Sequence, residues 1–212
     1  MKTSILIATY GDEAWRDLAW SRAFPSAEVQ DAFEVLVRHE SEGTISKVRN
    51  SLGEQAKGDW LLFLDADDEL DPVFLHSMEK THEKIGRPSR VLYTPAVSQV
   101  HMSGKRRPAR HYRRGNLQND NYLAVGTMLE RSLFLEVGGF GEYPHGFEDW
   151  SLWAKCWKAG ASIVQVPGAV YYAHLNPDSK HRVMWKDRQW QMEMHHRVRR
   201  DIFPELYRRA RR

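Results

Sequence analysis

Cysteine is almost absent from this chain of 212 residues, in which Cys156 is the only one. No disulfide can therefore form within the chain, and this fits a reducing compartment without requiring one. Long apolar runs are also missing. The stretch from Ile5 to Ala8 is too short for the core of a signal peptide, and no run approaches the ~18 apolar residues of a membrane span. We expect a cytoplasmic protein that does not cross a membrane.

Glycine-rich phosphate-binding patterns are missing as well. Neither the GxGxxG pattern of dinucleotide-binding proteins nor a P-loop occurs in the sequence, so an ordinary dinucleotide or ATP site is disfavoured. The composition is otherwise that of a soluble globular protein, with 42% apolar and 28% charged residues. A chain of this length can form one domain around a single core.

Positive charge is concentrated in two segments. Residues 105–114 hold six Lys or Arg and no acid, and residues 195–212 hold seven Arg against Asp201 and Glu205. Because the net charge of the chain is only +3, the remaining body is acidic. Basic segments of this kind suit phosphates, nucleic acid or an acidic lipid surface, so peripheral membrane contact through the tail stays open. Solvated arginines on a terminal helix explain the second segment equally well.

The apolar pattern of the first third predicts strands that alternate with helices. The expected strands are residues 3–8, 33–37 and 60–64, and the expected helices are residues 14–24 and 45–56. We expect Pro25 to end the first helix, since proline lacks a backbone donor. Strands that alternate with helices indicate βαβ units and a parallel sheet.

The rest of the chain continues this alternation less regularly. A basic loop is expected at residues 104–116. Strands are expected at residues 91–100, 124–130, 162–166 and 170–173, and helices at residues 72–85, 132–137, 148–159 and, with an interruption near Pro204, 183–212. The pattern contains no repeat and no convincing linker.

The stretch from Asp59 to Asp71 is the most informative part of the sequence. A short apolar run ends at Asp65, and extended backbone directs the side chains of Asp65 and Asp67 to the same face. Two carboxylates at the end of a buried strand suit one Mg²⁺ or Mn²⁺. For an isolated Asp-x-Asp, an acidic turn before a helix that starts at Asp71-Pro72 is the simpler interpretation. The preceding strand and the segments downstream favour the metal site.

Three predicted loops would share one edge of the sheet. They follow the first three strands, at residues 9–13, 38–44 and 65–68. Open α/β sheets bind ligands beyond the carboxyl ends of their strands. A nucleotide at this edge is therefore the expected ligand.

Five segments, taken in order, resemble the landmarks of family-2 glycosyltransferases. They are Thr9-Tyr10, Lys47 to Asn50, Gly58 to Asp68, Gly138 to Phe140, and Glu148 to Trp150. Each is weak alone, but the set is specific because both order and spacing match. The resemblance implies an A-type glycosyltransferase fold, a nucleotide-diphospho-sugar donor, a divalent metal ion and inversion at the anomeric carbon.

The resemblance also implies a division of the chain. Residues 1–180 would form a single α/β domain around one mostly parallel sheet. Within it, residues 1–100 would be the nucleotide-sugar-binding half and residues 101–180 the acceptor and catalytic half. Residues 181–212 would be a basic, helical carboxyl-terminal extension.

The landmarks carry implied roles on the donor side. Thr9 and Tyr10 would line the nucleotide pocket, Arg49 would reach the nucleotide or its phosphates, Asp65 would hold the ribose, Asp67 would hold the metal, and His174 would bind the metal or the diphosphate. One loop departs from the family pattern, because the usual Asp-Asp-Gly-Ser after the second strand is replaced by Arg38 to Thr44. Glu40 is a candidate for the base-reading carboxylate. The change weakens the usual assignment of uracil, although a UDP-sugar remains our prediction.

On the acceptor side, the resemblance assigns the catalytic base to Asp149. A general base must be an ionised carboxylate within reach of the attacking hydroxyl, and the dipole of a helix starting at Glu148 is expected to keep Asp149 charged near neutral pH. Glu148 is the next candidate. An acidic pair that merely complements the helix dipole is the simpler interpretation, and the Gly-Gly-Phe turn upstream favours catalysis.

The acceptor itself stays open between a protein side chain, a saccharide and a modified base in nucleic acid. Trp150, Tyr143 and His145 are candidate acceptor walls. The basic loop is either a lid over the diphosphate or a grip for an anionic acceptor. Two other functions compete: a nucleotidyltransferase with paired aspartates, and a non-catalytic nucleic-acid-binding module whose acidic cluster is only a turn.

Overall fold

The computed structural model describes residues 1–111, 115–143, 146–175 and 187–208. The amino-terminal half alternates strands and helices as expected: β1 (Thr3–Tyr10), α1 (Glu13–Leu18), η1 (Ala19–Ala23), α2 (Phe24–Glu28), β2 (Glu34–Glu40), α3 (Ile45–Gln55), β3 (Trp60–Leu64), β4 (Glu69–Leu70), α4 (Phe74–Lys84) and β5 (Val91–Val100). The second half contains β6 (Leu129–Glu130), α5 (Arg131–Glu136), α6 (Glu148–Lys158), β7 (Ser162–His174), α8 (Arg188–Ile202) and α9 (Pro204–Arg208).

The strands form the parallel-rich α/β sheet that the sequence predicts. Hydrogen bonds divide it into a four-stranded part, β2-β1-β3-β6, and a three-stranded part, β4-β7-β5. β1 runs parallel to β2 and β3, and β5 runs parallel to β7. An isolated antiparallel bridge between Tyr93 and Met128 joins the two parts. The carboxyl ends of β1, β2 and β3 therefore meet at one edge.

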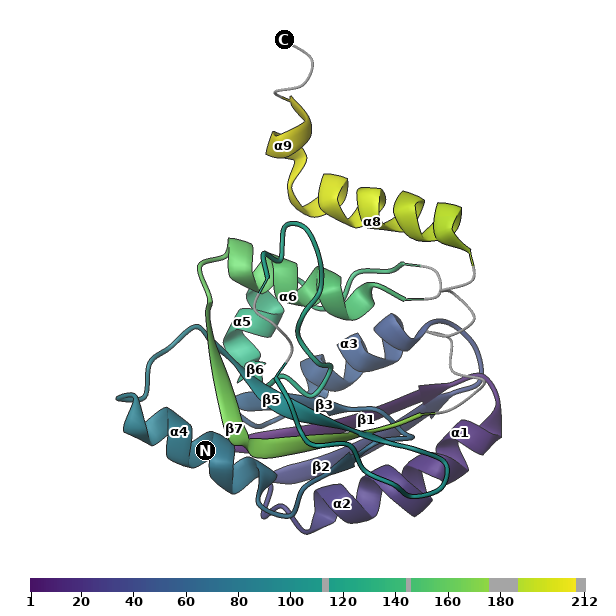
Figure 1. Ribbon diagram of the computed structural model, residues 1–212, viewed down its shortest axis with the longest axis vertical. Coiled ribbons are helices and arrows are strands. Elements are labelled where there is room, and N and C mark those ends of the chain that lie inside the picture. Colours follow the sequence, from purple (N-terminus) through teal and green to yellow (C-terminus); the bar gives the residue numbers. More distant parts are fainter. Residues whose placement is uncertain (112–114, 144–145, 176–186, 209–212) are drawn as a thin grey trace.

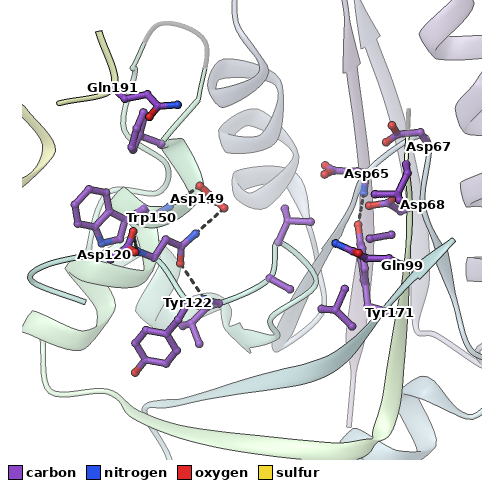
Figure 2. Close-up of a pocket in the computed structure, with 18 of the residues that line it drawn as sticks. Asp65, Asp67, Asp68, Gln99, Asp120, Tyr122, Asp149, Trp150, Tyr171 and Gln191 are labelled. Carbon is purple, nitrogen blue, oxygen red and sulfur yellow. Dashed lines mark hydrogen bonds between the residues drawn. The ribbon is translucent and has the colours of Figure 1, made fainter. Parts of the chain in front are cut away.

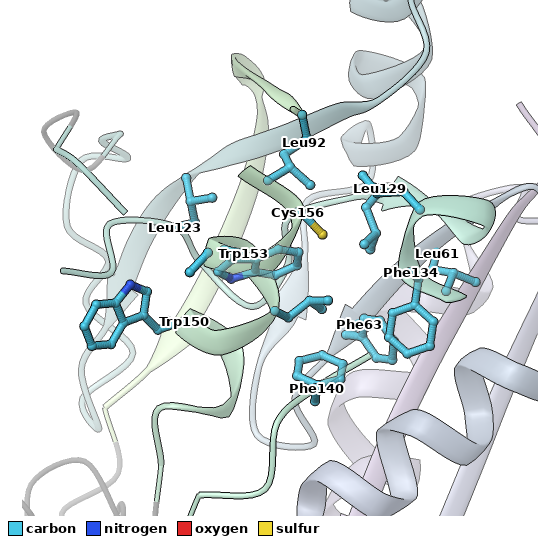
Figure 3. Packing of buried hydrophobic residues seen from close by; sticks show 14 of the residues in the cluster. Leu61, Phe63, Leu92, Leu123, Leu129, Phe134, Phe140, Trp150, Trp153 and Cys156 are labelled. Atoms are coloured by element: carbon cyan, nitrogen blue, oxygen red, sulfur yellow. The ribbon is translucent and has the colours of Figure 1, made fainter. Parts of the chain in front are cut away.

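Helices cover both faces of the sheet (Figure 1). In β1, Leu6 and Ala8 face a core shared with α3, α5 and α6, while Ile5 and Ile7 face a second core shared with η1 and α4. This alternation follows from the period of two residues along a strand. Figure 3 shows the first core, where Phe63 packs edge-on against Phe140 with ring centroids 4.7 Å apart. No helix in the described ranges is long and apolar enough to cross a bilayer.

Four expectations about the elements were wrong. Pro25 does not end the first helix, because the π-helical turn η1 precedes it and Pro25 lies in the first turn of α2, where its missing N–H is not needed. β2 continues to Glu40 instead of ending at Val37. Residues 124–130 are strand only at the two residues of β6. The two short strands after α6 are one strand, β7, whose pairing with β5 is irregular at Pro95/Ala96.

The basic loop folds back along β5 in its described part. Arg106 and Arg110 form isolated bridges with Val100 and Val97. The Arg106 guanidinium lies over the ring of Tyr172, 4.0 Å from its centroid. Residues 112–114, which include two of the six basic residues, are outside the described ranges. The described segment is thus held against the sheet by backbone pairing.

Candidate active site

Three carboxylates crowd the turn between β3 and β4. Asp65 and Asp67 follow the carboxyl end of β3, and Asp68 is buried. Burial raises the pKa of Asp67 to about 6, and the charge of Asp65 adds to the shift. Burial and the charges of Asp67 and Asp65 raise the pKa of Asp68 well above its usual range. A cation placed among these carboxylates would relieve the repulsion that raises their pKa values.

The end of β7 closes this cluster. The backbone N–H of His174 donates to Asp68 Oδ1 at 2.8 Å, and the His174 Nε2 atom lies 2.5 Å from Glu69 Oε2. Metal-binding imidazoles commonly pair their second nitrogen with a carboxylate in this way. No group of three His, Cys, Asp or Glu side chains able to hold a metal occurs within the described ranges. Mg²⁺ is often bound by one or two carboxylates plus substrate phosphates, and this donor set fits that mode.

Arg49 connects the acidic turn to α6. Its guanidinium is buried and donates to Asp65 Oδ1 at 2.6 Å and to Glu148 Oε1 at 3.0 Å. Burial opposes its charge, but the adjacent carboxylates of Asp65 and Glu148 hold the Arg49 pKa above its ordinary value. The structure therefore brings three predicted site residues into one ionic network, and a contact between Arg49 and the nucleotide stays a prediction.

Asp149 lies in the first turn of α6, after Phe147, which has a left-handed backbone with φ of 68°. Its Oδ1 accepts from the backbone N–H of Trp150 at 2.7 Å, and its Oδ2 accepts from Asn121 Nδ2 at 2.8 Å. Burial and the charge of Glu148 raise the pKa of Asp149 to about 7. Burial beside a second acid therefore opposes the ionised form that the helix dipole is expected to favour at Asp149.

A cavity of about 950 Å³ separates the two acidic groups. Asp65, Asp67 and Asp68 lie on one side and Asp149 on the other, as Figure 2 shows. Further polar and aromatic side chains line it from β5, the loop before β6, β7 and α8: Gln99, Asp120, Asn121, Tyr122, Tyr171, His174, Gln191, His195 and His196. A cavity of this size accommodates a sugar together with part of a second substrate.

The remaining donor-side predictions lie at the ends of β1 and β2. Tyr10 pairs with Glu40 across the two strands. Thr9 Oγ1 lies 3.0 Å from His39 Nδ1, and Glu40 accepts from Arg38 Nε at 2.6 Å. The three predicted residues share the edge that also carries Asp65, but they are not among the residues that line the large cavity. Their contact with a nucleotide stays a prediction.

The predicted acceptor walls lie in different surroundings. Trp150 is buried, donates from Nε1 to the Leu117 carbonyl at 2.8 Å and lines the cavity. Tyr143 points instead toward the carboxyl-terminal helices, where its hydroxyl is 3.4 Å from Asp201 Oδ2. His145 lies outside the described residues. Of the three candidates, Trp150 is the one that the structure brings to the cavity.

Sequence reasoning missed the polar loop that reaches Asp149 and the helix that covers it. Asn121 lies in the run from Asn116 to Asn121, whose density of amides and turn-forming residues was a usable signal. α8 was treated as a basic extension, although it contributes four cavity-lining residues and buries Val198 and Ile202 in the main core. The predicted boundary at residue 180 lies outside the described residues and stays a prediction.

The fold and the paired acidic groups define the class of protein: an α/β domain of the A-type glycosyltransferase fold. The model of the glycosyltransferase-like family 2 matches residues 2–194, and the chain belongs to that family. A protein of Sinorhizobium fredii described as uncharacterized protein y4gI is 28% identical over 152 residues. The match covers 68% of this chain but only 16% of that relative.

Solved structures share the fold at low sequence identity. S. aureus TarS 1-349 superposes with a TM-score of 0.63 and 19% identity, over 82% of this chain and 60% of that chain. Its complex with UDP-GlcNAc gives a TM-score of 0.64 and 17% identity, over 85% and 61%. GalNAc-T7 with UDP, GalNAc and Mn²⁺ gives 0.54 and 15%, over 84% and 45%. This chain thus spans less than two thirds of each of these solved chains.

Proposed function

We propose that this protein transfers a sugar from a UDP-sugar to an acceptor hydroxyl, with a divalent metal ion on the donor side and inversion at the anomeric carbon. The observation that carries the proposal is the cavity with three carboxylates after β3 on one side and Asp149 on the other. Membership of the family supports sugar transfer. The TarS complex with UDP-GlcNAc supports the donor class.

On the donor side, the acidic turn would bind the metal and the diphosphate. Asp67 would be the protein's main ligand, and His174, oriented by Glu69, would add an imidazole. When bound, Mn²⁺ or Mg²⁺ would stabilise the negative charge that grows on the departing nucleoside diphosphate. Asp65, held by Arg49, would accept hydrogen bonds from the ribose. The GalNAc-T7 complex with Mn²⁺ supports a divalent ion in this fold.

On the acceptor side, Asp149 would take the proton from the attacking hydroxyl. The new bond to the anomeric carbon forms on the face opposite the departing diphosphate, so a single displacement inverts that centre. A pKa of about 7 suits the role, because a general base works best when its pKa is near the working pH. Glu148 is engaged by Arg49 and would act electrostatically rather than as the base.

The acceptor would enter between the 120–125 loop and α8. Tyr122, Trp150 and His195 give this part of the cavity an aromatic lining, and the rings of Trp150 and His195 lie 4.6 Å apart. Gln191 and Asp120 add hydrogen-bonding groups. Flat aromatic and amide side chains of this kind fit a hydroxyl-bearing acceptor, which would be a protein side chain, a saccharide or a modified base in nucleic acid.

A hydrolysis screen across nucleotide-sugars tests this function without knowledge of the acceptor, since water takes the place of the hydroxyl. With Mn²⁺ or Mg²⁺, we expect release of UDP from at least one UDP-sugar, and little release in EDTA. Asp149→Asn is the matched inactive control. A parallel incubation with UTP and a sugar 1-phosphate tests the alternative, because a nucleotidyltransferase would form the nucleotide-sugar there and release pyrophosphate. Turnover of no nucleotide-sugar under any metal condition would contradict the proposal.

A further inference from the structure

Asn121 makes a side-chain hydrogen bond to Asp149 that no part of the function proposed above requires. Its Nδ2 atom donates to Asp149 Oδ2 at 2.8 Å, across 28 positions of sequence (Figure 2 draws this bond). Both residues line the cavity. The contact therefore lies where the acceptor hydroxyl would meet its base.

The orientation of the Asn121 amide is fixed by a second bond. Its Oδ1 accepts from the backbone N–H of Leu123 at 3.0 Å, so the NH₂ group is the end that faces Asp149. Its own backbone N–H donates to Asp120 Oδ1 at 2.8 Å. A reversed amide would lose the bond from Leu123 and place an oxygen against a carboxylate. The Asn121 side chain is thus oriented so that its NH₂ group donates to Asp149.

The loop that carries Asn121 is held at several points. Trp150 Nε1, one residue after Asp149, donates to the Leu117 carbonyl at 2.8 Å. Arg199 of α8 donates to Asn119 Oδ1 at 3.2 Å. These contacts link the loop to α6 and α8, so the position of Asn121 relative to Asp149 is set by tertiary structure and not by the loop alone.

We propose that Asn121 is a positioning residue that orients the Asp149 carboxylate and favours its ionised form. The inference rests on the proposed function. With Oδ1 held by the Trp150 N–H and Oδ2 by Asn121, the carboxylate plane is fixed, and one lone pair on each oxygen remains for the acceptor hydroxyl. Hydrogen bonds to an ionised carboxylate stabilise it more than they stabilise the neutral acid.

Several charged groups set the ionisation of Asp149 together with Asn121. From α6 and α3, Glu148 and Arg49 act on its charge. The titratable groups that share its cavity are Asp65, Asp67 and Asp68 after β3, Asp120 of the 116–123 loop, His174 at the end of β7, and His195 and His196 of α8. Substitution of Asn121 removes none of these groups from the chain. A change in Asp149 ionisation in an Asn121 variant therefore reports the loss of this hydrogen bond.

The test compares Asn121→Ala and Asn121→Asp with the wild-type protein. The ionisation of Asp149 is measured in the ligand-free protein by carboxyl ¹³C NMR, with its resonance assigned by its loss in Asp149→Asn. We expect the midpoint to move up by about one pH unit in Asn121→Ala, the lower end for a hydrogen bond to a charged group. We expect a larger shift in Asn121→Asp, which keeps the oxygen that accepts from Leu123 but places a carboxylate beside Asp149.

Activity gives a second readout. At pH 7, the hydrolysis rate at saturating UDP-sugar should fall about five-fold in Asn121→Ala and recover by about pH 9, since a base with a pKa near 8 is mostly protonated at pH 7. The KM for the donor should stay within two-fold. Gln118→Ala is the control, because Gln118 lies in the same loop, contacts Asn116 at 3.4 Å and is not among the cavity-lining residues.

The outcomes separate this proposal from the one on which it rests. An unchanged Asp149 midpoint in both variants would overturn the positioning role, whatever the activity. A loss of activity in Asn121→Ala that is equal at every pH would also overturn it, since a disturbed loop has that effect. If the midpoint moves as expected but the wild-type protein hydrolyses no nucleotide-sugar, the proposed function fails and the hydrogen-bond inference stands.

Discussion

Asp149 combines a useful pKa with a thermodynamic cost. Burial and Glu148 raise its pKa from 3.8 to about 7. An acid whose pKa is higher in the folded state than in the unfolded state destabilises the fold once the pH exceeds the unfolded value. Arg49, through its bonds to Asp65 and Glu148, limits this cost by keeping a positive charge close to the acids. The strained backbone of Phe147, just before the helix, is a second local cost at the same place.

This cost predicts that Asp149→Asn stabilises the protein in a pH-dependent way. Below pH 3.8 the carboxyl is neutral in both states and contributes no penalty. As the pH rises toward 7, the unfolded chain has released its proton while the folded chain still holds it, so wild-type stability falls. The shift from 3.8 to about 7 corresponds to about 4 kcal/mol once both states are ionised. An amide can accept only one of the two hydrogen bonds that the carboxylate accepts, so part of this gain is lost. We expect Asp149→Asn to exceed wild type by about 1–2 kcal/mol at pH 8 and by less at pH 5, measured by urea unfolding.

Asp17→Asn, at a carboxylate on the surface, is the control for the unfolding measurements on Asp149→Asn. The side chain of Asp17 is 71% exposed and pairs with Arg16, and exposed pairs contribute little to stability. Asp17→Asn should therefore change the free energy of unfolding slightly and by similar amounts at both pH values. A gain in Asp149→Asn that does not grow between pH 5 and pH 8 would contradict a raised pKa at Asp149.

At the scale of the elements, α8 is as much a part of the core as it is a wall of the cavity. Val198, Ile202 and the following Phe203 are buried with residues of α3, α5 and α6. Gln191 and His195, on another part of the helix, line the cavity. Figure 1 shows α8 lying across the outer side of α6. Because one helix serves both purposes, loss of its packing should disturb the proposed acceptor side of the site.

Phe203→Ala tests the packing of α8. Phe203 is 1% exposed, and its ring lies near Trp157, with centroids 6.1 Å apart, and under the Lys158 ammonium at 5.5 Å. We expect a loss of about 3–5 kcal/mol in the free energy of unfolding, as for other buried Phe-to-Ala changes. Leu206→Ala, at a position 40% exposed, should stay within about 0.5 kcal/mol. Equal effects would show that α8 is peripheral to the fold.

The elements also show where sequence reasoning succeeds and where it cannot. β3 was predictable because Trp60 to Leu64 is apolar on both faces, and the start of α3 was predictable because Thr44 caps it. β4 was not, since it exists through pairing with β7, about a hundred residues later. The same division holds at the site. The acidic residues belong to local motifs, whereas the hydrogen bond of Asn121 depends on a partner 28 positions away.

At the scale of the whole molecule, the cavity lies between two structural units, one that carries the acidic turn after β3 and one that carries Asp149. The acidic turn after β3 is fixed by the parallel sheet and by His174 at the end of β7. Asp149 is fixed by α6 and by the 116–123 loop. Arg49 is the described residue whose two ion pairs join these units. Separate supports for the proposed donor and acceptor groups predict that each can be disabled without the other.

That separation predicts that Asp67→Asn and Asp149→Asn both reduce transfer but differ in their effect on metal and donor binding. Asp67 would bind the metal, so its loss should weaken Mn²⁺ and UDP binding together and reduce transfer with them. Asp149→Asn keeps the shape but removes the proton acceptor, so donor affinity should stay within a few-fold while transfer falls by at least ~10²-fold. The wild-type rate should rise with pH around the Asp149 pKa of about 7, and this limb should vanish in Asp149→Asn.

Two measurements on the same proteins test this prediction. Calorimetry with UDP, in Mn²⁺ and in EDTA, gives the donor affinity and its dependence on metal. Rates of transfer measured across a range of pH show the effect of Asp149. Equal UDP affinity with and without metal in the wild-type protein would remove the metal from the donor side. If Asp149→Asn transfers sugar at near the wild-type rate, Asp149 is not the general base and only complements the dipole of α6. Glu148 would then be the next candidate base to test. Parallel losses of donor affinity and transfer in both variants would contradict the division itself, since they would show that the two acidic groups act as one site across the cavity.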